Sequence, residues 1–589
     1  MPKKKWGGLK PNLNSLRRQA IAIEKAAARH RQAFSKNRLR NFKKVRYSAV
    51  LWVSLMAVLI LAVVLQGVIY NFNTTTWSGR AGGTYAEGIV GEITSFNPLY
   101  ASSEDEKAIS SLVYSSLFKT DSSNALRGDL ATTWKISNDG LNYDIKLRDD
   151  VFWQNSDETV SADDVVFTFG LLQNPLAQSE LYDSWRSITV SKIDNQTVRF
   201  RLKTALNSFP WALDIGILRR AELKDVEVGE LREHLADHTA TGSGPFKFHS
   251  TSLSSDNNQI LFFVPNESYY TGAPAVESFH IETFADDEAL VAGFNSGEIN
   301  VATNISLTKA QALPAGEVHT TPLDSGVFAI FNTDNGVAAS TKVRQALRLA
   351  LDREQVRTAA AIDKRAPNNL ETPLPRGIFS DVDDLSQPKT NVEKAEKTLS
   401  DSGWRFNKDL VRAKDGVAMK LNIVAVKGSD YVAVAENLAT QWRRIGVQAE
   451  VTLAEPENFQ QNFLLPRNYD VLVHQLQLGG DGDVYPYWHS SGARDSGLNF
   501  ANYSSPVADL ALARGRSQNG TALRASAYKT FAKTWLADAP AIALYQANLN
   551  YLVSDSAEIW NGQNLVDKSM RFRDAAEFTV NSEAVNKTP

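Results

Sequence analysis

Two pairs of side chains have a spacing that could support catalysis or metal binding. Ser116 and Lys119 stand in a Ser-x-x-Lys spacing, which can set a lysine beside a nucleophilic hydroxyl. His234 and His238 are four residues apart and would share one face of a helix, as two metal ligands do. No Lys-Thr-Gly accompanies the first pair, and the second lacks a third ligand and an intervening Glu. We therefore predict no catalytic residue and no metal site from either pair.

The run Gly-Gly-Asp-Gly-Asp at residues 479–483 places two carboxylates two positions apart. Asp481 and Asp483 resemble the start of a calcium loop, but the twelfth position is Gly492 rather than the Glu that such a loop needs. The same residue types are also typical of a tight surface turn. The spacing alone leaves the role of these carboxylates open.

Composition excludes several classes of protein. The chain has 589 residues and no cysteine, so disulfides, thiolate metal sites and a cysteine nucleophile are excluded. No Gly-x-x-x-x-Gly-Lys-Ser/Thr segment occurs, which excludes a P-loop ATPase. The length is sufficient for two or three domains with their own cores.

Charge is divided unevenly along the chain. Residues 1–47 contain 15 Lys or Arg and a single acid, Glu24, whereas the whole chain carries −3. Residues 49–69 follow as 21 uncharged, mostly apolar residues, enough to span a hydrocarbon core of about 30 Å. A cleaved signal peptide has a shorter apolar run and a small-residue cleavage site. We therefore expect a basic cytoplasmic tail over 1–47, a transmembrane signal-anchor over 48–70 and a flexible linker over 71–83, with the acidic bulk outside.

The elements between Gly140 and Phe169 follow from local pattern. Tyr143, Ile145 and Leu147 alternate with polar residues, which predicts a strand with one buried face. A short aromatic strand and a polar loop come next. Ser161 then stands where it can cap a helix that begins with acidic residues.

Later segments alternate helix and strand, which favours an α/β lobe. One helix follows a strand near Phe328, with Val343, Ala346, Leu347 and Ala350 at helical spacing on one apolar face. Further strands are expected at 421–426, 469–480 and 540–554.

This order of segments resembles the family 5 extracellular solute-binding proteins, which serve ABC importers. The resemblance rests on GLNYDIKLRDDVFWQNSDETVSADDVVFTF (140–169), GGTYAEGIVGEITSFNPLYA (82–101), ATGSGPFKF (240–248), FNSGEINVA (294–302) and the Asp-x-x-x-Tyr-x-Tyr-Trp-His-Ser run that begins at Asp481. It implies an α/β, two-lobed, periplasmic-binding-protein-like clamshell with an inserted subdomain, here preceded by one transmembrane helix. The expected parts are lobe I at 84–325, with the insertion at about 96–215, lobe II at 326–530, and a return to lobe I at 531–589.

The resemblance also implies a site and a role. Asp481 matches the family Asp that pairs with the α-ammonium group of a peptide, although Gly482 stands where many relatives have Pro. The other implied ligand contacts are Tyr485, Trp488, Tyr100 and Phe328. Tyr485 and Trp488 could instead pack against their own lobe. We expect no cofactor, no enzymatic activity and no nucleic-acid binding.

The expected function is that of a monomeric, membrane-anchored receptor that captures oligopeptides outside the cytoplasm, in the periplasmic space or its equivalent. It would deliver them to the permease subunits of an ABC importer. The alternatives are an oligosaccharide, haem or metal complex as the solute, and, outside this class, a membrane-tethered enzyme or scaffold.

Overall fold

The structure is a computed structural model of the whole chain. It describes residues 17–18, 20–32, 50, 52–63, 66, 75–80, 82–121, 123–237, 241–305, 317–360, 369–494, 496–518, 520–554, 557 and 565–586.

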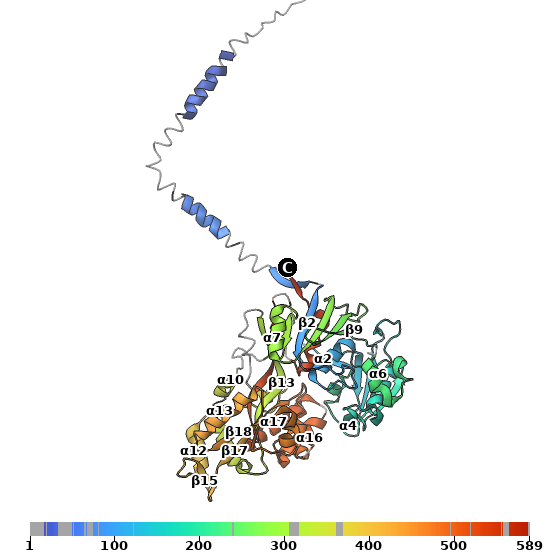
Figure 1. Cartoon of the computed structure of the whole chain (residues 1–589), viewed down its shortest axis with the longest axis vertical. Helices are drawn as coiled ribbons and strands as arrows, with labels where there is room; N and C mark the ends of the chain where they lie inside the picture. The colour runs from blue at the N-terminus through green and yellow to red at the C-terminus, as the bar shows by residue number, and fades with distance from the viewer. Residues whose placement is uncertain are drawn as a thin grey trace, which may run out of the picture. The chain divides into compact units, whose positions relative to one another are not determined.

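One ten-stranded sheet of mixed direction runs through the part of the chain from Gly79 to Ser582 (Figure 1). We call residues 84–325 and 541–586 the first lobe and residues 326–538 the second lobe. The strands lie in the order β18 (Gln448–Ala454), β17 (Lys420–Val426), β19 (Val471–Gln477), β13 (Glu317–Phe331), β20 (Ala541–Val553), β12 (Val301–Thr303), β2 (Thr84–Val90), β11 (Ser278–Phe284), β10 (Gln259–Pro265) and β9 (Phe246–Leu253).

Strands β13 and β20 connect the two lobes. They pair antiparallel along most of their length, from Glu317 opposite Val553 to Ile330 opposite Ala541. Their register is interrupted between Pro322 and Gly326, because the intervening residues leave the ladder. A pair of strands with a local interruption is a structure that can bend, as a hinge between lobes requires.

Helices cover the sheet and close its cores. The predicted apolar face of α9 (Thr341–Leu349) is confirmed, since Val343, Ala346 and Leu347 are fully buried. The other helices are α2 (Glu104–Val113), α4 (Tyr182–Trp185), α5 (Arg220–Leu223), α6 (Leu231–Asp237), α7 (Asp287–Ser296), α10 (Arg353–Ala359), α11 (Ser380–Asp383), α12 (Val392–Asp401), α13 (Tyr431–Arg443), α14 (Pro456–Phe459), α15 (Tyr485–Trp488), α16 (Pro506–Ser517) and α17 (Thr521–Asp538).

A second sheet of four strands lies within residues 96–215, for which we keep the name inserted subdomain, in the order β5 (Ala131–Ile136), β6 (Asn142–Leu147), β8 (Thr197–Arg201) and β7 (Thr189–Asp194). The alternation predicted for β6 is confirmed, because Tyr143, Ile145 and Leu147 are all buried. Helix α3 (Ala162–Leu172) begins after Ser161, whose backbone N–H donates to Asp164 Oδ2 at 2.9 Å. Of the short aromatic strand, only an isolated bridge between Phe152 and Thr159 forms.

Three smaller sheets complete the strands. They consist of β3 (Phe118–Thr120) with β4 (Leu126–Gly128), β14 (Arg405–Phe406) with β15 (Arg412–Lys414) and β16 (Val417–Ala418), and β1 (Thr75–Arg80) with β21 (Asn581–Asn586). Strand β1 falls within residues 71–83, which we expected to be a flexible linker. Two threonines and a tryptophan in it favour extended backbone, which accounts for the difference.

Two helical stretches precede β1. Residues 20–32, within the predicted basic tail, are helical. Residues 52–63 are also helical, and their large apolar side chains are exposed, from Trp52 at 67% to Val63 at 60%. Among the described residues, no helix has the length and apolar character that a membrane crossing needs. Much of the predicted anchor, including 67–70, lies outside the described residues.

Two predicted lobe boundaries fall inside regular elements. The boundary at 325/326 lies within β13, and the boundary at 530/531 lies within α17, which packs against α16 and continues to Asp538. Sequence pattern does not mark such boundaries, because the chain passes between lobes without a loop.

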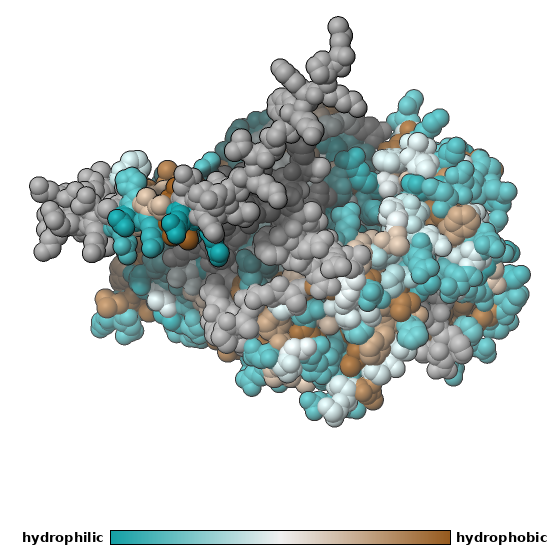
Figure 2. Space-filling model, turned by 90° about the horizontal axis from the view of Figure 1, so that it is seen from above, coloured by the Kyte–Doolittle hydropathy of each residue, from teal (hydrophilic) through white to brown (hydrophobic). Residues whose placement is uncertain are grey.

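On the face seen in Figure 2, apolar residues occur in small groups among hydrophilic ones.

Candidate functional site

A loop at the end of β19 forms the centre of the candidate site. This loop, Gly479–Asp483, turns through left-handed backbone at Gly479 (φ 71°) and Gly482 (φ 73°). Asp481 Oδ1 accepts a hydrogen bond from the Asp483 N–H at 2.9 Å, which closes the turn. A Cβ at position 482 would lie 2.8 Å from the Phe379 ring, so glycine is required there. The turn chemistry read from the sequence is therefore real.

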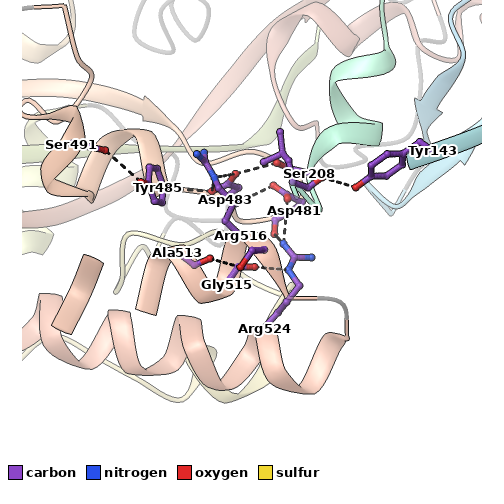
Figure 3. Close-up of polar contacts among 12 residues, drawn as sticks. Tyr143, Ser208, Asp481, Asp483, Tyr485, Ser491, Ala513, Gly515, Arg516 and Arg524 are labelled. Carbon is purple, nitrogen blue, oxygen red and sulfur yellow. Dashed lines mark hydrogen bonds and ion pairs between the residues drawn. The ribbon is translucent and has the colours of Figure 1, made fainter. Parts of the chain in front are cut away.

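Two arginines from α16 and α17 balance the two carboxylates (Figure 3). Arg524 Nη2 lies 3.2 Å from Asp481 Oδ2, and Arg516 Nε lies 2.8 Å from Asp483 Oδ2. The Asp481 side chain is only 10% exposed. Burial, with repulsion from Asp483, raises the pKa of Asp481, and Arg524 opposes that shift. The loop thus holds its charges in pairs at the edge of the second lobe.

The backbone of the loop has unused hydrogen-bonding capacity. No described residue accepts a hydrogen bond from the N–H of Gly479 or of Gly480. Immediately before them, the Gln477 side chain reaches the first lobe, where its Nε2 donates to Glu104 Oε1 at 2.9 Å. The free N–H groups therefore lie next to a point where the two lobes meet.

The inserted subdomain contacts this loop directly. Ser208 Oγ donates to Asp483 Oδ2 at 3.0 Å. The Trp211 ring lies against Gly480, where a Cβ would be 2.3 Å from two ring atoms. The described arrangement is therefore closed at this edge.

A separate cavity of 420 Å³ lies in the first lobe. Its described lining comes from the first lobe alone and includes Tyr114, Lys107, Asp214 and Asp567. This volume is in the range of small-ligand sites.

The predicted site residues separate into two groups. Asp481 and Tyr485 come together at the loop, where the Arg516 guanidinium stacks on the Tyr485 ring at 4.0 Å. Trp488 and Phe328 instead lie in the hydrophobic core, with their ring centroids 6.0 Å apart. Burial of two large rings against each other stabilises the second lobe and leaves neither free to line a pocket.

Tyr100 is also buried, at 8% exposure, beneath the Arg232 guanidinium at 4.5 Å. The sequence did not point to Arg516, Arg524, Ser208 or Trp211 as contacts of the loop. No local signal marks them, because each meets the loop only through tertiary contact.

The catalytic spacings do not form catalytic geometry. Ser116 Oγ donates to the backbone oxygen of Phe118 at 2.6 Å, and Lys119 Nζ lies 3.4 Å from Asp129 Oδ1. The serine hydroxyl and the lysine are thus engaged with other partners. His234 lies on α6, and His238 lies outside the described residues. Among the described residues, no cluster of His, Asp and Glu could hold a metal ion.

Comparison with known proteins adds the family. The model of the bacterial extracellular solute-binding proteins, family 5 (middle), matches residues 125–497. The oligopeptide-binding protein AppA of Bacillus subtilis (strain 168) is 28% identical over 493 residues, which cover 81% of this chain and 89% of that protein. The heme-binding protein A of Haemophilus influenzae is 25% identical over 58% of this chain and 64% of its own length.

Solved structures agree in fold. AppA of Bacillus subtilis in complex with a nonapeptide superposes with a TM-score of 0.67 at 25% identity, covering 85% of this chain and 100% of that one. NikZ of Campylobacter jejuni in complex with Ni(L-His) gives a TM-score of 0.68 at 26% identity, covering 84% and 99%. This chain therefore belongs to the family 5 bacterial extracellular solute-binding proteins and is a non-enzymatic, extracytoplasmic receptor of an ABC importer.

Proposed function

We propose that this chain is a membrane-anchored receptor that binds oligopeptides in extended form and delivers them to the permease of an ABC importer. The observation that carries the proposal is the free N–H of Gly479 and of Gly480 beside the buried carboxylate of Asp481. An extended peptide presents carbonyl groups at a regular spacing and can pair with such an edge as an added strand. Binding through the backbone accepts many side-chain sequences.

Asp481 would hold the amino terminus of that peptide. An ammonium group is the one cation that every unmodified peptide carries, and a charge-assisted bond inside a closed cleft contributes about 1.5–3 kcal/mol. Arg524 already lies 3.2 Å from one carboxylate oxygen, so the ligand would share Asp481 with this arginine. Tyr485, which stands near the same loop, is the proposed neighbour of the first ligand side chain.

The names of the relatives support a peptide as the solute, and they also provide the alternative solutes. AppA is named for oligopeptides, and its solved complex contains a nonapeptide. NikZ was solved with a nickel–histidine complex, and another relative is named for haem. A metal complex or haem is therefore the outcome that would replace the peptide.

The test is to identify what the protein carries. We expect native mass spectrometry of the full chain, purified from its own cells in detergent, to show adducts that fall to the free mass on denaturation. Sequencing of the released material by tandem mass spectrometry should return peptides. Released haem, or a nickel signal without peptide, would replace the proposed solute while leaving the receptor class intact.

The anchor is part of the same proposal. Helical residues 52–63 expose apolar side chains that water solvates poorly, and 15 Lys or Arg precede them, which favours a cytoplasmic amino terminus. Protease added to intact cells, or to spheroplasts if an outer membrane is present, should digest the chain after residue 71 and spare a tagged tail. A mature protein that begins near residue 75 would instead show that residues 48–70 are a cleaved signal.

A further inference from the structure

A short segment of the inserted subdomain, residues 207–211, contacts the second lobe at the edge of the binding loop. Ser208 Oγ donates to Asp483 Oδ2, and Arg516 holds the same carboxylate from α16 (Figure 3). On its own lobe the segment is fixed by Tyr143, whose hydroxyl donates to the backbone oxygen of Leu206 at 2.8 Å. The segment is therefore tied to the sheet of the insertion and reaches across to its neighbour.

Asn207 caps a helix of the opposite lobe. Its backbone N–H donates to the oxygen of Arg516 at 3.1 Å, and its side-chain amide donates to the oxygen of Gln518. These carbonyls belong to the carboxyl end of α16, where the helix itself provides no donors. A residue of the first lobe thus satisfies groups that the second lobe leaves unpaired when it stands alone.

Trp211 provides the apolar part of the contact. Its ring lies directly on Gly480, and any side chain at position 480 would push it away. The ring covers the loop from the side of the first lobe, so water is excluded from that surface only while the lobes are together.

We propose that Asn207, Ser208 and Trp211, here called the clasp, are positioning residues that favour the closed arrangement of the lobes through contacts between the lobes. These contacts join protein groups of the two lobes, so they favour closure whichever solute is bound. The free receptor therefore samples the closed form, and the strength of the clasp scales the affinity for every ligand. The effect on affinity rests on the proposed function, whereas the effect on closure does not.

The size of the effect follows from the contacts. One net hydrogen bond shifts a two-state equilibrium by about fivefold. Three hydrogen bonds and the buried part of an indole ring together favour closure by on the order of 100-fold, or somewhat less if the bonds are coupled. Because apparent affinity scales with the fraction of receptor that is competent to bind, removal of the clasp weakens binding by up to the same factor.

The absence of cysteine makes the test direct, because two introduced cysteines are labelled uniquely. Lys203→Cys on the insertion and Leu510→Cys on α16 replace exposed residues of the two lobes. Pulsed electron–electron resonance on the full chain in detergent, without added solute, should resolve a short-distance population. The triple variant Asn207→Ala, Ser208→Ala, Trp211→Ala should lose most of it, while Leu176→Ala, an exposed residue of the same subdomain, should not.

A receptor with no short-distance population, or one in which the triple variant leaves that population unchanged, would overturn the proposal. Circular dichroism and melting of the triple variant establish that it is folded, and Ser208→Ala alone, a milder change, should shift the population about fivefold. Calorimetry with a defined mixture of synthetic peptides of three to nine residues is the second measurement. Altered closure with no peptide binding in any variant would contradict the proposed solute and leave the clasp supported.

Discussion

Arginine–carboxylate pairs occur in two very different places in this protein. In the first lobe, Arg571 Nε lies 2.8 Å from Glu87 Oε1, and both side chains are completely buried. At the edge of the second lobe, Arg524 and Arg516 pair with Asp481 and Asp483 on a loop that keeps partial contact with solvent. The chemistry is the same, but the surroundings differ.

The surroundings decide what each pair does. Glu87 also accepts a hydrogen bond from the Tyr85 hydroxyl at 2.7 Å, and Arg571 Nη2 lies 2.8 Å from Asp105 Oδ1, so the buried guanidinium lies close to two carboxylates. Separation of this pair would leave an unpaired charge in the core. The pair therefore holds the carboxyl-terminal segment against β2 in the folded protein. The pairs at the loop can open at lower cost because their arginine side chains are 19% and 27% exposed, whereas Arg571 is completely buried. A receptor that must release its cargo needs the second kind at its moving edge.

Breaking the buried pair should have the largest effect. Arg571→Met leaves Glu87 and Asp105 without their cation, and we expect a loss of about 3–5 kcal/mol in unfolding free energy. Urea denaturation of the full chain measures this loss of unfolding free energy. Lys397→Met, which breaks an exposed pair with Asp401, is the matched control and should cost under about 0.5 kcal/mol. Similar losses for both variants would remove the distinction between the two regions.

Asp481 tests the edge pair through ligand rather than stability. If Asp481 holds the α-ammonium group, Asp481→Ala should weaken free peptides by about 2–4 kcal/mol, because a buried cation loses its partner. Peptides acetylated at the amino terminus lack that cation, so the mutation should cost them little. Calorimetry on the four combinations decides the matter. Additive losses would show that Asp481 serves only Arg524 and the turn.

Asp324 offers a third environment. It is a buried carboxylate, and no arginine of the described residues forms an ion pair with it. It lies at the interruption of β13 and accepts a hydrogen bond from Asn124 Nδ2 at 2.9 Å. Burial raises its pKa to about 6, despite that bond, and Asp567 adds to the shift. Between about pH 4 and 6 the native state therefore keeps a proton on Asp324 that the unfolded chain, with a pKa near 4, has released. The stability that Asp324 contributes to the protein falls as pH rises through this range.

Asp324→Asn removes this dependence. We expect the variant to be more stable than the parent by about 1–2 kcal/mol at pH 8, with the gain vanishing as pH falls below about 4. Urea denaturation at pH 4, 6 and 8 gives the profile. A gain of equal size at every pH would mean that packing, and not the charge of Asp324, is responsible.

Local pattern predicted much of the fold because the elements that it predicted are held by local forces. The alternation at Tyr143, Ile145 and Leu147 and the helical face of α9 are visible in sequence, since burial repeats with the period of the element. The predicted lobe boundaries at 325/326 and 530/531 fall inside β13 and α17, and a chain that crosses in regular structure carries no turn residues to mark the place, so they stay predictions from the resemblance.

The site was predictable only where one loop carries it. Asp481 and Tyr485 are four residues apart and lie together at one loop, whereas their contact with a ligand stays a prediction. Trp488 was assigned to the ligand although it packs on Phe328, since nothing in an aromatic residue's type separates a pocket wall from a core. Ser208 lies 275 residues from Asp483 in the sequence, and Arg524 lies 43 residues from Asp481. No local sequence pattern acts over such separations.

The smallest effect should come from a pair with good geometry but open surroundings. Arg199 Nε and Nη2 each lie 2.6 Å from one oxygen of Asp144, across β8 and β6 of the insertion. The side chains are 45% and 31% exposed, so water and salt compete for both charges. Arg199→Gln should lower the unfolding free energy only slightly in low salt and even less at 0.5 M NaCl, measured by urea denaturation. Since the bidentate geometry here is at least as good as that of Arg571 with Glu87, a loss as large as that of Arg571→Met would show that geometry, and not burial, decides the strength of these pairs.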